Sequence, residues 1–439
     1  MRVLKLSGRK SSNLIIKGQG IYVFDYVKET DESEPKAKFK FETLDELGEQ
    51  DGLEVFFTTD SVRVVRISNQ KEYLDPTNKS GLSKFSGAYY WFSLDAQNQM
   101  FYAGVGEARV ETVIYQYKFV FDSDELGQKE RELNKKFLES ICVFNSGNTN
   151  SIKLIKDPVT QQVPLKVIDS DNVTMEMLSQ NDFMLVSNLP LTSQKLYYSI
   201  SGSKIVLDDN DFPQFSQAIE HSIRTPGLWC YEKLKAKSTE FNKDKPNEYE
   251  TYLRITLGQN NGESPGIPYV MEIWPPNHYS PIHSHAGAEA IIRVLGGTIH
   301  VDLYPFLCGK TEDTEVTGQT GQTGQTGQTG ITGIKPFGQE DFGFNEFAWV
   351  SPGLNQTHQL TNKNPNITCI TLNCYLYGES NSVHYDYFDY VDSDGIIKHY
   401  EPDSDMDFIS FKKLMKSEWY EQSKKRNSRK YIKFNNTKI

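Results

Sequence analysis

The sequence of 439 residues contains little cysteine, no long apolar run and fewer basic than acidic side chains. Its five cysteines are odd in number and form no Cys-x-x-Cys pair, which argues against a disulfide framework and a cysteine-based zinc site. No apolar stretch reaches the roughly eighteen residues of a membrane span. The net charge of −11 argues against general nucleic-acid binding. Because the first residues lack the apolar stretch of a signal peptide, we expect a cytoplasmic protein.

Alternation of β-branched and aromatic residues with polar ones predicts a mainly β protein. In the N-terminal part, this pattern predicts strands at Leu14–Val23, Leu53–Thr58, Val62–Ile67, Tyr89–Leu94, Gln99–Val105 and Glu111–Phe121. Several short strands predict a separate β-sandwich-like domain, which we place at residues 1–205. Residues 125–139 are the clear helical stretch in this part, with Leu126, Leu133 and Phe137 spaced for one face. The sequence does not indicate what this domain binds.

A second β-rich domain is predicted at residues 206–405. A helix at Pro213–Ile223, with Asp211 as its N-cap candidate, would begin it. The predicted strands are Thr251–Leu257, Tyr269–Ile273, Ala290–Leu295, Thr298–Leu303, Phe347–Val350 and Ile367–Leu376. A low-complexity insert at 309–337 contains the Thr-Gly-Gln triplets of 317–333, for which we expect a disordered surface loop. Residues 406–439 are basic and predict a short helix with a solvated tail, or else a membrane-surface or partner contact.

The most informative pattern is His283-Ser-His285, followed further along the chain by His358. Residues two apart on a strand point to the same face, so His283 and His285 can present two imidazoles to one metal ion. His358, in a later predicted strand region, would supply the third. Three neutral nitrogens leave coordination positions open, as a catalytic metal requires. The alternative is that these histidines line a polar interior without a metal.

The segments around these histidines resemble the two cupin motifs. The first motif, G-x5-H-x-H-x(3,4)-E-x6-G, corresponds to Asn277, His283, His285, Glu289 and Gly296. The second, P-x-G-x2-H-x3-N, corresponds to Pro352, Gly353, His358 and Asn362. Asn277 replaces the family's first glycine, and the Pro-Gly pair of the second motif lies further from its histidine. The resemblance implies a jelly-roll β-barrel of the cupin type for residues 206–405.

Within the cupins, residues 215–395 resemble the cysteine dioxygenase family of thiol dioxygenases. Tyr252-Leu-Arg254 is similar to the family's Tyr-x-Arg segment, whose arginine binds the substrate carboxylate, and Trp274 also matches. Tyr377 corresponds to the family's catalytic tyrosine. The resemblance implies one Fe(2+) per chain, bound by His283, His285 and His358. It further implies that a small, carboxylate-bearing thiol, cysteine-like, is oxidised by O₂ to its sulfinate.

The sequence departs from this family at several positions. Ala290 stands where animal members have a cysteine crosslinked to the catalytic tyrosine, and Asn373 and Tyr375 replace a serine and a histidine. Glu289 is a possible fourth ligand, which would indicate a different metal-dependent cupin with a non-thiol substrate. A third alternative is a non-catalytic binding protein that uses its N-terminal domain. We expect His278 to be structural rather than a ligand.

Overall fold

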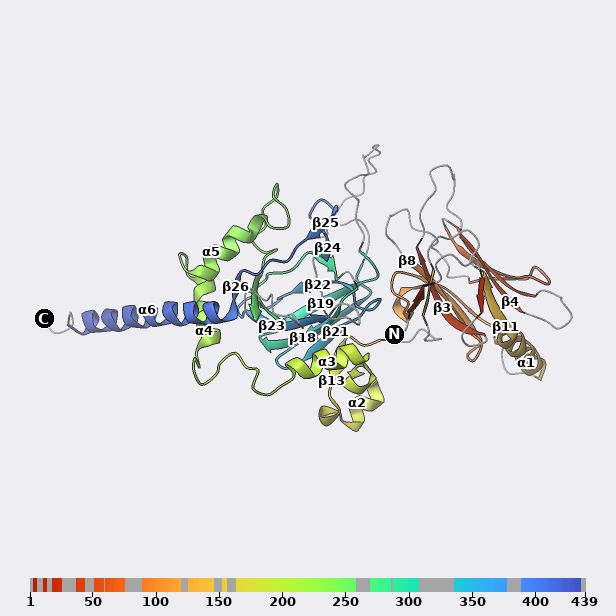
Figure 1. The fold of residues 1–439 in the computed structure, drawn as a ribbon, viewed down its shortest axis with the longest axis horizontal. Helices are drawn as coiled ribbons and strands as arrows, with labels where there is room; N and C mark the ends of the chain where they lie inside the picture. The colour runs from red at the N-terminus through yellow and green to blue at the C-terminus, as the bar shows by residue number, and fades with distance from the viewer. Residues whose placement is uncertain are drawn as a thin grey trace. The chain divides into compact units, whose positions relative to one another are not determined.

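The computed structural model describes residues 3–5, 11–13, 18–25, 37–43, 51–58, 60–75, 89–119, 125–145, 152–155, 163–257, 269–285, 287–307, 335–376 and 388–435. Within these ranges the protein is mainly β, with strands arranged in four sheets (Figure 1). The chain divides into two compact units. Of the described residues, the first unit holds those up to 163 with 304–307 and 335–337, and the second holds those of 164–303 and 338–435.

The first unit contains two six-stranded sheets. In spatial order, one sheet is formed by β1 (Val3–Lys5), β12 (Ile152–Ile155), β3 (Gln19–Asp25), β8 (Tyr89–Asp95), β9 (Met100–Val105) and β10 (Val113–Lys118). The other is formed by β2 (Ser11–Asn13), β11 (Ile141–Asn145), β4 (Ala37–Thr43), β5 (Gly52–Phe57), β6 (Val62–Arg66) and β7 (Glu72–Tyr73). Six of these twelve strands, β3, β5, β6, β8, β9 and β10, overlap the predicted ranges, whereas the other six were not predicted.

Aromatic side chains from both sheets form one core in this unit. Phe24 of β3 and Phe92 of β8 pack with Phe39 of β4, at ring-centroid distances of 4.6 and 4.8 Å to Phe39. Burial alternates along β4, as expected for a strand with one face against the core, although this strand was not predicted from the sequence. Helix α1 (Glu125–Ser140) matches its predicted range. Of its predicted apolar face, Phe137 and Leu138 are buried, whereas Leu133 is 64% exposed.

The second unit also contains two sheets. An eight-stranded sheet is formed by β14 (Met184–Leu185), β13 (Lys166–Ile168), β21 (Phe347–Val350), β18 (Glu289–Gly296), β23 (Cys369–Leu376), β16 (Tyr269–Trp274), β15 (Leu253–Leu257) and β26 (Met406–Asp407). A six-stranded sheet is formed by β20 (Gly338–Phe342), β19 (Ile299–Tyr304), β22 (Thr357–Thr361), β17 (Ile282–Ser284), β24 (Phe388–Val391) and β25 (Ile397–Tyr400). In the described residues these strands form two sheets rather than the single closed barrel that was expected.

Residues 164–205 pack with the second unit, although the sequence analysis assigned them to the N-terminal domain. Lys166 in β13 pairs with Ala348 in β21, and the Lys166 ammonium lies 3.1 Å from a carboxylate oxygen of Glu346. Helix α3 (Leu191–Ile200) covers β18 and β23, with Leu196 fully buried. The difference arises because these contacts join segments some 180 residues apart, which no local pattern reveals. The unit also contains α2 (Met175–Gln180).

Three further helices pack beside the sheets: α4 (Phe215–Arg224), α5 (Trp229–Ala236) and α6 (Phe408–Asn435). Helix α4 lies close to its predicted range, but its N-cap is Gln214 rather than Asp211. The basic segment forms a 28-residue helix instead of a short helix and a tail, and Figure 1 shows α6 lying against α4. Its Phe411 is fully buried between Phe215 and Trp229. None of the helices in the described ranges combines the length and apolar character needed to cross a membrane.

Candidate metal centre

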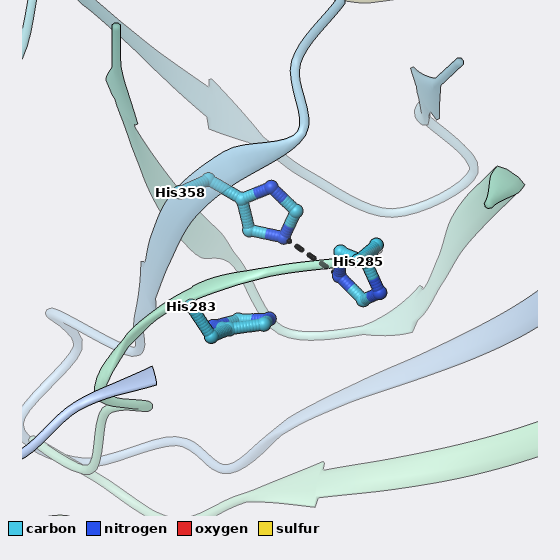
Figure 2. A group of neighbouring side chains, drawn as sticks. All are labelled: His283, His285 and His358. Atoms are coloured by element: carbon cyan, nitrogen blue, oxygen red, sulfur yellow. Dashed lines mark hydrogen bonds between the residues drawn. The ribbon is translucent and has the colours of Figure 1, made fainter. Parts of the chain in front are cut away.

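Two antiparallel strands bring the three histidines together. His283 in β17 pairs directly with His358 in β22, and residues opposite one another in a ladder point to the same face. His285 follows β17 and lies two residues from His283, so it points to that face as well. Figure 2 shows the three imidazole rings directed toward one another. The register between β17 and β22 therefore turns a His-x-His motif into a group of three.

The distances within this group are short. Nε2 of His285 lies 3.2 Å from Nε2 of His358, drawn as the dashed line in Figure 2. Each histidine offers one ring nitrogen, and the three nitrogens lie within 4.8 Å of one another. All three side chains are buried, with at most 5% of their surface exposed. A single metal ion, with metal–nitrogen bonds of about 2.0–2.1 Å, can therefore contact all three after small side-chain adjustments.

Backbone carbonyl groups orient two of the imidazoles. Nδ1 of His283 lies 3.0 Å from the carbonyl oxygen of Pro281, and Nδ1 of His358 lies 2.9 Å from that of Asn355. Because a carbonyl oxygen only accepts hydrogen bonds, each Nδ1 carries the proton and donates it. The lone pair of each neutral ring then lies on Nε2. This is the usual arrangement by which outer hydrogen bonds prepare histidine for metal binding.

Burial keeps these imidazoles neutral. Desolvation lowers the pKa of His283 to about 3 and that of His358 to about 4. It also lowers the pKa of His285 well below its usual 6.5. The neighbouring histidines and the Arg254 guanidinium push the pKa of His283 and His285 in the same direction. Three neutral nitrogen donors without a carboxylate suit a divalent metal that binds imidazole, such as iron or zinc.

A cavity opens beside the histidines. Its wall belongs to both sheets of the second unit and is mainly apolar, including Tyr252, Trp274, Ile292, Val294, Ile299, Val301, Phe342, Val350, Leu360, Tyr375 and Phe388. The polar wall residues besides the histidines are Arg254, Glu272 and Asn373. An apolar pocket with a few convergent polar groups is the usual form of a small-molecule site.

Arg254 and Tyr252 both line this cavity, as their spacing on one strand face predicts. Tyr252 stacks on Trp274, with ring centroids 4.3 Å apart. Arg254 is only 3% exposed, and its Nη1 donates to Oε1 of Glu272 at 2.9 Å. This ion pair is buried in the cavity wall. The arginine therefore has an acidic partner from the protein itself, and its predicted role in binding a substrate carboxylate stays a prediction.

The remaining predicted residues are Glu289, Tyr377 and His278. Glu289 accepts a hydrogen bond from Ser193 at 2.8 Å and does not belong to the metal-capable group found among the described residues. Tyr377 lies outside the described residues, so its predicted catalytic role stays a prediction. Nδ1 of His278 contacts the Thr251 carbonyl oxygen at 2.9 Å, as expected for a structural histidine.

Two motif residues of the cupin pattern have clear local roles. Asn277 adopts a φ of 66°, in the left-handed region that glycine favours and asparagine tolerates, which explains how it can replace the motif's glycine. The fully buried Asn362 amide lies 2.8 Å from the Trp274 carbonyl oxygen and 2.9 Å from that of Ile367. It thereby connects the chain entering β17 with the chain entering β23.

Three cavity residues were not predicted as site residues. Glu272 is a charged residue within the otherwise apolar segment Tyr269–Trp274, and this anomaly is the signal that would have identified it. Asn373 was noted only as a departure from the family. Tyr375, noted in the same way, stacks on His285 with ring centroids 5.5 Å apart.

No protein-family model matches the chain. Solved cupin structures align with part of it. A sugar phosphate isomerase of the cupin superfamily from Silicibacter pomeroyi is 14% identical over 35% of this chain and 78% of its own, with a TM-score of 0.20. A cupin 2 domain-containing protein from Halorhodospira halophila is 16% identical over 36% of this chain and 73% of its own, with a TM-score of 0.19.

A curated relative was also found. Protease ElaD from Escherichia coli O157:H7 is 28% identical over 192 residues, which are 38% of this chain and 45% of the protease. The chain thus spans less than half the length of this relative. None of these matches identifies a family for the whole chain. The buried group of three histidines defines a candidate metal-binding site in the second unit.

Proposed function

We propose that this protein is an iron-dependent thiol dioxygenase that oxidises a small, carboxylate-bearing thiol to its sulfinate. One molecule of O₂ is consumed, both of its atoms enter the product, and the thiol sulfur supplies the electrons. The observation that carries the proposal is the group of three buried, neutral imidazoles beside a buried guanidinium in one cavity. When bound, iron(II) would supply the redox chemistry that lets O₂ react with the thiol.

The three histidines would hold the metal through their Nε2 atoms. Because all three are neutral, they leave the metal's double positive charge uncompensated, which favours an anionic thiolate as an additional ligand. The carbonyl oxygens of Pro281 and Asn355 keep two of the rings in the binding tautomer. The donor set therefore fits a metal that must accept substrate, and burial excludes most competing water.

Arg254 would bind the substrate carboxylate. A guanidinium has five N–H donors in a planar arrangement, so one side chain can contact both Glu272 and a substrate. Its position in the cavity wall lies close enough to the histidines to lower the pKa of His283 and His285. Tyr252 and Trp274 would shape the apolar surface against which the substrate packs. Tyr377 would complete the site as the resemblance implies.

A second candidate is another metal-dependent cupin that uses Glu289 as a fourth ligand. The position of Glu289, with its carboxylate bonded to Ser193 and outside the histidine group, favours the three-histidine site. A non-catalytic binding protein is the third candidate. It predicts that removing the histidines leaves the binding of a partner by the N-terminal domain unchanged.

Metal analysis and oxygen-uptake measurements would test the proposal. The protein loaded with iron(II) should consume O₂ with cysteine or 3-mercaptopropionate and release the sulfinate, detected by mass spectrometry. His358→Gln should abolish iron binding, whereas the matched control His300→Gln, altered at a histidine bonded to Asp341, should retain it. Iron binding without sulfinate from any thiol would favour the second candidate.

Arg254→Ala tests the carboxylate contact. Its loss should reduce turnover of cysteine at least thirtyfold, or about 2 kcal/mol in the barrier, because a charge-assisted pair is lost. The iron content should remain unchanged. Cysteamine, which has no carboxylate, should lose little. Equal losses for both thiols would show that Arg254 does not bind the substrate.

A further inference from the structure

Three polar side chains lie on one face of three adjacent strands in the cavity wall. Arg254 in β15 pairs directly with Glu272 in β16, and Asn373 lies on β23, the next strand of the sheet. Glu272 pairs with Thr371 and lies diagonally to Asn373, two residues further along β23. Residues two apart on a strand share a face, so all three side chains point into the cavity that they line.

These side chains interact with one another as well as lining the cavity. Arg254 donates to Glu272 at 2.9 Å. Burial raises the pKa of the Glu272 carboxyl, while the neighbouring Arg254 and Asn373 act in the opposite direction. At most 4% of the surface of each residue is exposed. One positive and one negative charge therefore face the cavity beside three neutral imidazoles, and the wall carries no net charge.

Asn373 has an unused hydrogen-bonding atom. Its Oδ1 is buried and has no hydrogen-bond partner in the structure. Buried polar atoms without a partner are rare in folded proteins and indicate that a ligand or water supplies the missing bond. Together with the Glu272 carboxylate, Oδ1 forms a pair of acceptors facing the cavity, and such acceptors suit a group rich in N–H donors.

We propose that Glu272 and Asn373 form a subsite for an ammonium group, so that the cavity binds an α-amino acid as its zwitterion. This inference rests on the proposed function for the role of Arg254, which binds the carboxylate, while Glu272 and Asn373 accept hydrogen bonds from the ammonium. In the metal-free protein, a zwitterion adds no net charge to a wall that has none. A ligand with one charge would bury that charge without full compensation.

Binding of non-thiol analogues to the metal-free protein tests the subsite independently of turnover. Isothermal titration calorimetry should compare L-serine with 3-hydroxypropionate, which lacks the ammonium, and with ethanolamine, which lacks the carboxylate. Serine should bind at least about tenfold more tightly than either, because it alone occupies both ends of the polar wall. Undetectable binding of serine, or equally tight binding of either single-charge analogue, would overturn the proposal.

Two variants identify the residues. Glu272→Gln keeps the shape and removes the charge, and it should reduce the preference for serine over 3-hydroxypropionate at least tenfold. The control Glu340→Gln removes a carboxylate paired with Lys166 outside the cavity and should retain the preference. Asn373→Leu removes the Oδ1 acceptor but keeps the ion pair, so it provides the test if Glu272→Gln fails to fold. An unchanged preference in a folded variant would overturn the role of that residue.

These outcomes are separate from those of the sulfinate assay. If serine is preferred but no thiol gives a sulfinate, the dioxygenase proposal is wrong and the ammonium subsite remains. If cysteine is oxidised but serine shows no preference over 3-hydroxypropionate, the dioxygenase proposal stands and the subsite is wrong.

Discussion

The buried histidines predict a specific loss of stability when the metal-free protein is acidified. In the folded protein, the pKa of His283 is about 3 and that of His358 about 4. In the unfolded chain, each imidazole returns to a pKa of about 6.5. Between these values the unfolded state binds more protons than the folded state. The free energy of unfolding therefore falls as the pH falls below about 6.5, and this loss is complete only near the folded pKa values.

The magnitude follows from the size of this pH window. Each pH unit below the unfolded pKa costs about 1.4 kcal/mol per histidine, so pH 5 costs about 2 kcal/mol each. His283 and His358 together should cost about 4 kcal/mol. Both side chains are only 4% exposed, so solvent screening reduces this value little. A loss of this size is a large part of the roughly 5–15 kcal/mol that stabilises a typical domain.

Urea unfolding of the chelator-treated protein at about pH 7.5 and pH 5 measures this effect. Tryptophan fluorescence is a suitable signal because four of the five tryptophans, Trp229, Trp274, Trp349 and Trp419, lie in the second unit. The matched variant is His283→Gln/His358→Gln, which has no titrating groups at these positions. The wild type should lose about 4 kcal/mol more than the variant on acidification. Losses that agree within about 1 kcal/mol would refute the argument that burial keeps the two imidazoles neutral.

Three further predictions concern packing and charge. Arg254→Met and Glu272→Leu should each destabilise the second unit by about 3–5 kcal/mol, because each leaves a buried charge without its partner. The double variant should lose much less stability than the sum of the two single losses. Additive losses in urea unfolding would contradict a direct interaction between the two side chains. Phe411→Ala should lower the free energy of unfolding by about 3–5 kcal/mol, because the ring is fully buried. The control Ile409→Ala, at a side chain 71% exposed on the same helix, should change it by less than about 0.5 kcal/mol. Replacing residues 317–333 with a short Gly-Ser linker should leave metal content and turnover within about tenfold of wild type, because polar Gly-rich triplets cannot build a core. A larger loss of turnover would show that this segment shapes the site.

Local patterns in the sequence were sufficient for many elements. Strand β8 and helix α1 lie within one residue of their predicted ranges, because alternation and helical spacing depend only on neighbouring residues. The shared face of His283 and His285, and that of Tyr252 and Arg254, follow from the two-residue period of a strand in the same way.

The partners of these residues were decided only by the tertiary structure. His358 completes the histidine group because β22 pairs with β17 in one particular register, and a shift of one residue would point its ring to the opposite face. Arg254 meets Glu272 for the same reason, through the register of β15 and β16. Residues 164–205 join the second unit, and α6 buries Phe411, through contacts between segments distant in sequence. Such pairings depend on how whole sheets and helices pack. The sequence alone therefore indicated candidate residues such as the three histidines and Arg254, whereas the tertiary structure decided which side chains contact one another.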